Sequence, residues 1–119
     1  MPPERDPIYL WDMLTAAKGI AASVQSLTLE RYLGDENLRL AVERRIEIIG
    51  EAARRISDEF KRAHPEVPWR PIIDQRNVLI HEYDEIEHER IWNLAVRAIP
   101  DLIVKLAPLL PPLPPKPGN

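Results

Sequence analysis

The residues best suited to chemistry in this chain of 119 residues lie in one short stretch, Asp74–Tyr83. It brings an arginine, an amide, an imidazole and a phenol together within eight residues, as Arg76, Asn77, His81 and Tyr83. An imidazole with its ordinary pKa of about 6.5 can move a proton near neutral pH, and a guanidinium can bind a phosphate. The stretch is therefore either a reaction site or an unusually polar part of a helical core.

Helical geometry sets how these side chains relate to one another. At about 100° per residue, Asn77 and His81 share one face of a helix, whereas Arg76 and His81 point roughly 140° apart. Three arrangements would let both residues act on one small group. Arg76 could reach around the helix, the helix could end near His81, or a second copy of the chain could supply one of the two residues. We favour the last arrangement, because self-complementary pairing across a two-fold axis is the common form of dimer. The structural alternative pairs Arg76 with Asp74 or Glu82 and leaves His81 as a hydrogen-bonded core residue.

The motif Arg-x4-His-x-Tyr, formed by Arg76, His81 and Tyr83, resembles that of HepT-like proteins in the HEPN superfamily, the toxin halves of toxin–antitoxin pairs. The resemblance extends over roughly residues 5 to 107. Further segments carry it in the same order: Arg5-Asp6, Tyr9-Leu10, Ala41–Arg44, Glu47–Ala52, Pro65–Trp69 and Ile91-Trp92.

This resemblance implies a ribonuclease that needs neither metal nor cofactor and leaves 2′,3′-cyclic phosphate ends at a site shared by two protomers. Arg76 and His81 would be catalytic, with Asn77 supporting them by orienting the imidazole or donating to the phosphate. It also implies a partner, a small nucleotidyltransferase antitoxin that attaches AMP to Tyr83. Phosphate charge beside Arg76 would occupy the guanidinium and block the RNA groove.

A second hypothesis belongs to a different functional class. A HEPN dimer could bind nucleotide or a nucleotidyltransferase partner and cut nothing, with Arg76 and His81 serving recognition only. Tyr83 could likewise be a structural tyrosine, whose ring covers the core while its hydroxyl stays in water.

Composition limits the remaining possibilities. The formal charge of −3 gives no general basicity that would indicate a nucleic-acid-binding protein, and the absence of cysteine rules out thiolate metal sites. The sequence has no apolar run long enough for a membrane span and no signal-peptide pattern, so we expect a cytoplasmic protein without membrane contact. No glycine-rich phosphate loop occurs. Glu85 and His88 have the Glu-x-x-His spacing of di-iron bundles but lack the second such pair, so we expect no metal and place His88 at the surface.

Apolar residues at helical spacing predict four main helices. The first starts with Asp6 as N-cap and Pro7 at its first position, and runs to about Leu27. Residues 28–34 form a link or short helical turn, and Asp35 caps the second and longest helix. A proline-rich connection at residues 64–71 leads into the third helix, which starts between Pro68 and Pro71, carries the motif and ends near Tyr83. The last helix begins around residues 85–87, is bent by Pro100 and ends at Pro108.

The second helix contains two informative positions. Gly50 costs about 1 kcal/mol relative to alanine in a helix interior, so we expect another backbone to pack closely against it. Ser57 marks a kink or a new cap before Phe60. The polar face of this second helix has charged residues at ion-pair spacing, which favours ordinary surface ion pairs over a phosphate-binding surface. These residues are Arg44, Glu47, Glu51, Arg54 and Arg55.

Together these features predict an all-α, mostly antiparallel bundle of four to five helices that forms a two-fold homodimer. The bundle spans residues 1–110. Proline makes up six of the last twelve residues, so residues 111–119 are expected to form an extended, flexible tail.

Overall fold

The structure is a computed structural model that describes residues 3–81 and 87–111, with only the backbone of residues 3 and 77–81. The described residues are mainly helical and include no β-strand, which confirms the predicted all-α class. Within these ranges, no helix has both the length and the apolar character needed to cross a membrane.

The helical elements follow one another with short connections. Their bounds, in chain order, are η1 Pro3–Arg5, α1 Asp6–Val24, α2 Leu29–Leu33, α3 Glu36–Arg55, α4 Asp58–Ala63, α5 Trp69–His81, α6 His88–Asn93, η3 Leu94–Ala98, α7 Ile99–Leu106 and η4 Ala107–Leu109.

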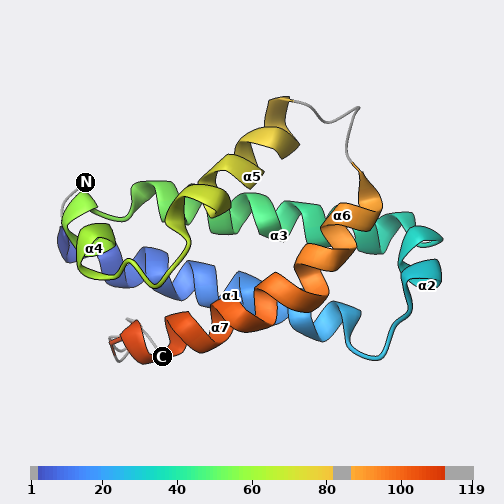
Figure 1. The fold of residues 1–119 in the computed structure, drawn as a ribbon, viewed down its shortest axis with the longest axis horizontal. Helices are drawn as coiled ribbons and strands as arrows, with labels where there is room; N and C mark the ends of the chain where they lie inside the picture. Colours follow the sequence, from blue (N-terminus) through green and yellow to red (C-terminus); the bar gives the residue numbers. More distant parts are fainter. Residues whose placement is uncertain (1–2, 82–86, 112–119) are drawn as a thin grey trace, which may run out of the picture.

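Helix α3 is the centre of the arrangement. It lies antiparallel to α1 on one side and packs against α5 on another, while α7 covers α1 (Figure 1). The core between α1 and α3 is mainly apolar, with Met13, Ala17, Ile20 and Val42 all at 0% exposure. Helix α5, which carries the motif, makes its main contact with α3.

Two predicted helix caps are confirmed. The side chain of Asp35 accepts a hydrogen bond from the backbone N–H of Leu38 (3.0 Å) at the start of α3. Ser57 accepts from the N–H of Phe60 (3.2 Å), so it caps α4 and separates this short helix from α3. The polypeptide can turn here because α3 ends at Arg55 and Ile56 is extended.

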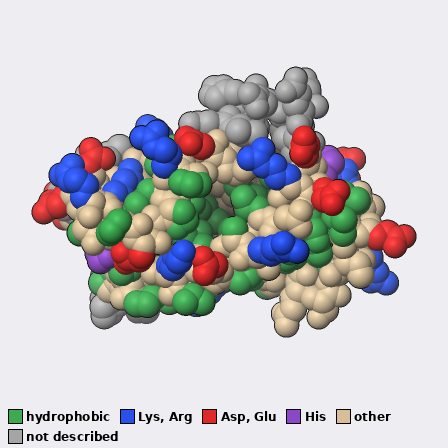
Figure 2. Space-filling view, viewed as in Figure 1, with side chains coloured by type: hydrophobic (Ala, Val, Ile, Leu, Met, Phe, Trp, Pro, Cys, Tyr) green, Lys and Arg blue, Asp and Glu red, His purple; other side chains and the backbone are tan. Residues whose placement is uncertain are grey.

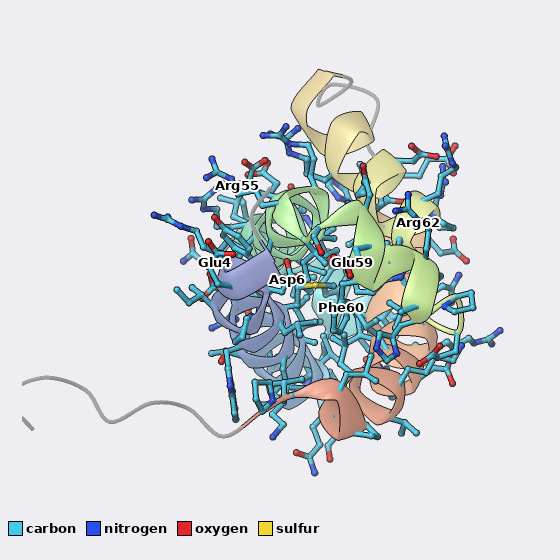
Figure 3. All side chains as sticks on the ribbon, turned by 90° about the vertical axis from the view of Figure 1, so that its left-hand side faces the viewer. Glu4, Asp6, Arg55, Glu59, Phe60 and Arg62 are labelled. Carbon is cyan, nitrogen blue, oxygen red and sulfur yellow. The ribbon has the colours of Figure 1, made fainter. Side chains whose placement is uncertain are left out.

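The prediction for Asp6 as N-cap of the first helix is wrong. Arg5 occupies the cap position without a side-chain bond, and Asp6 is the first residue of α1. Its carboxylate is 4% exposed and accepts from both the N–H (2.8 Å) and the hydroxyl (2.6 Å) of Ser57. A buried carboxylate needs such donors, and these hold the start of α1 against the start of α4 (Figure 3).

The other helix ends show how local chemistry shifts a boundary. Helix α1 ends at Val24 rather than near Leu27, and Ser26 adopts a positive φ of 63° in the following turn. Pro100, which cannot donate a backbone hydrogen bond, follows the π-helical turn η3. Pro111, assigned from the sequence to the tail, accepts a hydrogen bond from Trp11 Nε1 (3.0 Å); residues 112–119 lie outside the described residues.

Candidate functional site

Helix α5 carries the candidate site, and its first turn is anchored to the preceding loop. The indole of Trp69 is 8% exposed, donates to the carbonyl of His64 (2.9 Å) and meets the ring of Phe60 edge-on. The predicted start of this helix is confirmed. The anchor orients the rest of α5 across the face of α3 (Figure 1).

Helix α5 approaches α3 very closely at Gly50. A Cβ atom at this position would lie 2.2 Å from the Cβ and 2.8 Å from the Cγ of Arg76, and 3.2 Å from the carbonyl oxygen of Ile72. No ordinary side chain fits there unless α5 moves. The expectation of close packing at Gly50 is therefore confirmed, and the residue that packs there is the arginine of the motif.

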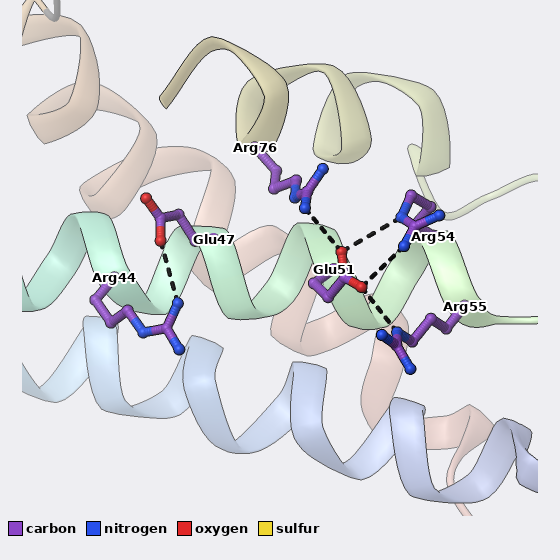
Figure 4. Close-up of polar contacts among 6 residues, drawn as sticks. All are labelled: Arg44, Glu47, Glu51, Arg54, Arg55 and Arg76. Atoms are coloured by element: carbon purple, nitrogen blue, oxygen red, sulfur yellow. Dashed lines mark hydrogen bonds and ion pairs between the residues drawn. The ribbon is translucent and has the colours of Figure 1, made fainter. Parts of the chain in front are cut away.

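The side chain of Arg76 crosses from α5 to α3. Its Nη2 lies 3.0 Å from Oε2 of Glu51, which is the residue after Gly50 (Figure 4). The Arg76 side chain is 22% exposed, so it is largely enclosed but still partly accessible to solvent. Sequence reasoning missed Glu51 as a partner of Arg76. The available signal was its position next to the glycine where two helices were expected to meet.

Glu51 collects further guanidinium groups from its own helix. Its Oε1 accepts from Arg54 Nη2 (3.0 Å) and Arg55 Nε (2.8 Å), and its Oε2 accepts from Arg54 Nε (3.3 Å). These hydrogen bonds, with the positive charges of Arg54 and Arg76, lower the pKa of Glu51 to about 2. The carboxylate is therefore ionised near neutral pH. The expected surface ion pairs of α3 are confirmed.

Only part of the predicted site falls within the described residues. The backbone of Asn77 and His81 belongs to α5, the helix that also carries Arg76. The side chains of Asn77 and His81, and all of Tyr83, lie outside the described residues. The structure therefore describes the contacts of Arg76 but not those of the other three candidates.

Comparison with known proteins identifies the chain at the level of its family. The family described as "Ribonuclease HepT-like" matches residues 13–109. The chain belongs to the HepT-like ribonuclease family. The matched range includes α5 and α3, so both Arg76 and Glu51 lie within the HepT-like region.

Curated relatives of this HepT-like chain are similar over most of their length. A probable ribonuclease HepT from Thermococcus cleftensis is 38% identical over 94 residues, which cover 79% of this chain and 86% of that protein. A candidate RNase from Methanocaldococcus jannaschii is 31% identical over 110 residues, which cover 92% of this chain and 91% of that protein. A candidate RNase from Caldanaerobacter subterraneus subsp. tengcongensis is 35% identical over 94 residues, which cover 79% of this chain and 84% of that protein. No solved structure gives a significant match.

A second polar cluster lies between α2, α3 and α6 of this HepT-like bundle. Glu43 is 4% exposed, and burial raises the pKa of its carboxyl. Its Oε2 lies 3.6 Å from Nδ1 of His88, whose side chain is 41% exposed, so the predicted surface histidine also faces the core. Burial, with the nearby charge of Glu43, raises the pKa of Tyr32 to about 12. The cluster thus brings polar side chains of α2, α3 and α6 close together.

Metal ligation finds no support in the described part of the HepT-like chain, where no group of three or more His, Asp or Glu side chains could hold an ion. Glu85, the other half of the Glu-x-x-His pair, lies outside the described residues.

A small apolar cavity of about 110 Å³ lies between α3, α5 and the η3–α7 segment. Ile46, Ile72, Leu94 and Leu102 line it, together with the buried amide of Gln75. Apolar side chains are visible in the hollow on this face (Figure 2). Among the described residues that line it, none could act as an acid, base or nucleophile, so these residues give no sign of a second reaction site.

Proposed function

We propose that this HepT-like protein is a metal-independent endoribonuclease, the toxin of a toxin–antitoxin pair, with catalytic residues Arg76 and His81. The observation that carries this proposal is the placement of Arg76. Its side chain is held at the α3–α5 contact yet 22% exposed, on the same helix as His81. A fixed, accessible cation is what the binding of a phosphodiester requires.

The proposed reaction uses the RNA's own 2′-hydroxyl as nucleophile. The 2′-oxygen attacks phosphorus and loses its proton, the bond to the 5′-oxygen breaks, and that oxygen takes up a proton. The products are a 2′,3′-cyclic phosphate and a 5′-hydroxyl. His81 moves the proton, Arg76 binds the phosphate and offsets the charge that develops on its oxygens, and Asn77 supports His81. Neither a metal nor a cofactor takes part.

We further propose that the active site is composite and forms in a homodimer. Arg76 and His81 diverge by roughly 140° around α5, which is too far for both to meet one phosphate easily from a single chain. Pairing of two α5 helices across a two-fold axis would place Arg76 of one protomer near His81 of its partner. This arrangement makes dimerisation a condition for activity.

The test is incubation of the purified protein with cellular RNA in the presence of a chelator. We expect cleavage and 2′,3′-cyclic phosphate ends, because neither Arg76 nor His81 needs a metal to act. The ends are identified by their resistance to phosphatase until they are opened by acid. Intact RNA at high protein concentration, with no change on His81→Ala, would instead support the non-catalytic binding module.

The toxin is proposed to be neutralised by AMPylation of Tyr83 by a small nucleotidyltransferase antitoxin. Tyr83 lies two residues after His81 and takes the tyrosine position of the motif. An added AMP would bring a phosphodiester charge and an adenine next to the Arg76 side of the site. Both the charge and the volume of AMP would keep RNA out. The acidic residues between Asp84 and Glu89 would give a basic partner a docking surface.

Tyr83→Phe is expected to abolish this modification while leaving most of the RNA cleavage, because only the hydroxyl that accepts AMP is removed. The measurement is intact mass after co-expression with the neighbouring nucleotidyltransferase. Wild type should gain one or more AMP units and Tyr83→Phe none. Equal gain by both proteins would place the modification on another residue, and no gain by either would mean that the partner acts by binding alone.

A further inference from the structure

We infer that Glu51 is a positioning residue for Arg76, which sets the orientation of the guanidinium that binds RNA. This inference rests on the proposed function, since it assigns Arg76 to the phosphate. Glu51 itself lies on α3, opposite the helix that carries the motif, and would not touch the RNA. It acts through Arg76 alone.

The Glu51 carboxylate is itself held in place before it meets Arg76. Arg54 binds both oxygens, at 3.0 Å and 3.3 Å, and Arg55 binds Oε1 at 2.8 Å, all from the same helix. The oxygen that contacts Arg76 at 3.0 Å is therefore attached to a group with little freedom to rotate (Figure 4). An acceptor that is already oriented can fix the direction of a long, flexible side chain.

The part of the Arg76 side chain nearest its backbone packs against Gly50. Because Gly50 has no side chain, the Cβ and Cγ of Arg76 pack directly against the backbone of α3. Two neighbouring residues of α3 thus hold the two ends of one arginine. A free arginine side chain samples many rotamers, and much of the entropy cost of ordering it is met here before any ligand binds.

The ion pair does not cancel the charge that RNA would meet. Three guanidinium groups, of Arg54, Arg55 and Arg76, share the single carboxylate of Glu51. The group therefore keeps a net positive charge, with the side chains of Arg54 and Arg55 50% and 45% exposed. Glu51 can orient Arg76 while the surface remains attractive to phosphate.

The test compares Glu51→Gln with Glu51→Asp and with a control, Asp101→Asn. Asp101 also pairs with a base four residues away, Lys105 at 2.9 Å, but on the exposed face of α7. Glu51→Gln should lower kcat for RNA cleavage roughly 10- to 100-fold with KM changed by less than about 3-fold, since misplaced catalytic groups cost rates of that order. Glu51→Asp, which keeps the charge, should recover part of kcat, and Asp101→Asn should match wild type.

A second readout does not depend on activity. The Nε–Hε signal of Arg76 in a ¹⁵N spectrum, assigned by its loss in Arg76→Lys, should report an ordered side chain in wild type and a mobile one in Glu51→Gln. Equal order in both proteins, or unchanged kcat in Glu51→Gln with an active wild type, would overturn the inference. If wild type cuts no RNA, the proposed function fails, and the NMR comparison still decides whether Glu51 positions Arg76.

Discussion

Subunits carrying Arg76→Ala and subunits carrying His81→Ala are each expected to lose RNA cleavage by at least about 10²-fold, yet to recover activity when mixed. If each site takes Arg76 from one protomer and His81 from the other, a mixed dimer contains one intact site and one site that lacks both residues. Random pairing makes about half of the dimers mixed, so the mixture should reach about a quarter of wild-type activity.

The measurement is cleavage rate after subunit exchange or co-expression of the two variants. The matched control mixes Arg76→Ala with the double variant Arg76→Ala/His81→Ala, which can form no intact site in any pairing. Activity at the level of this control would place both residues of a site in one chain. Full activity of wild-type monomers at high dilution would also contradict the composite site.

Gly50→Ala is expected to destabilise the protein and to reduce its activity, although alanine is about 1 kcal/mol better than glycine within a helix. The new Cβ would lie 2.2 Å from the Cβ of Arg76 and 3.2 Å from a backbone oxygen of α5, so α5 must move away. Overpacking of this kind costs about 1–3 kcal/mol, and the shift would also carry Arg76 away from Glu51. Urea denaturation and RNA cleavage measure the two effects.

Gly19→Ala is the matched control for this variant. Gly19 also lies inside a helix, α1, and a Cβ there would meet the Nε of Arg45 at 2.7 Å. That atom is near the end of a flexible side chain, which can move aside. We expect stability within about 1 kcal/mol of wild type. Equal losses for Gly19→Ala and Gly50→Ala would show that the close approach of α5 at Gly50 has no special cost.

The all-helical class, the caps at Asp35 and Ser57, and the start of α5 could be predicted because each depends on residues close together in the chain. Apolar spacing defines a helix over a few turns, and a cap needs only a side chain and an N–H three residues later. The close approach at Gly50 was also predictable, since a glycine inside a long helix indicates tight packing. The motif of Arg76, His81 and Tyr83 likewise depends on sequence alone.

What only the tertiary structure decided are the partners of charged residues that lie far apart in the chain. Local spacing suggested that Asp6 would cap its own helix, but burial at the α1–α4 contact turned its carboxylate to Ser57. Local spacing also paired Glu51 with Arg54 and Arg55, and it could not add Arg76, which comes from another helix. Sequence periodicity defines which face of a helix is buried, but the contacts between charged groups depend on how the helices lie against one another. For that reason the sequence named Arg76, and the fold identified Glu51 as the residue that holds it.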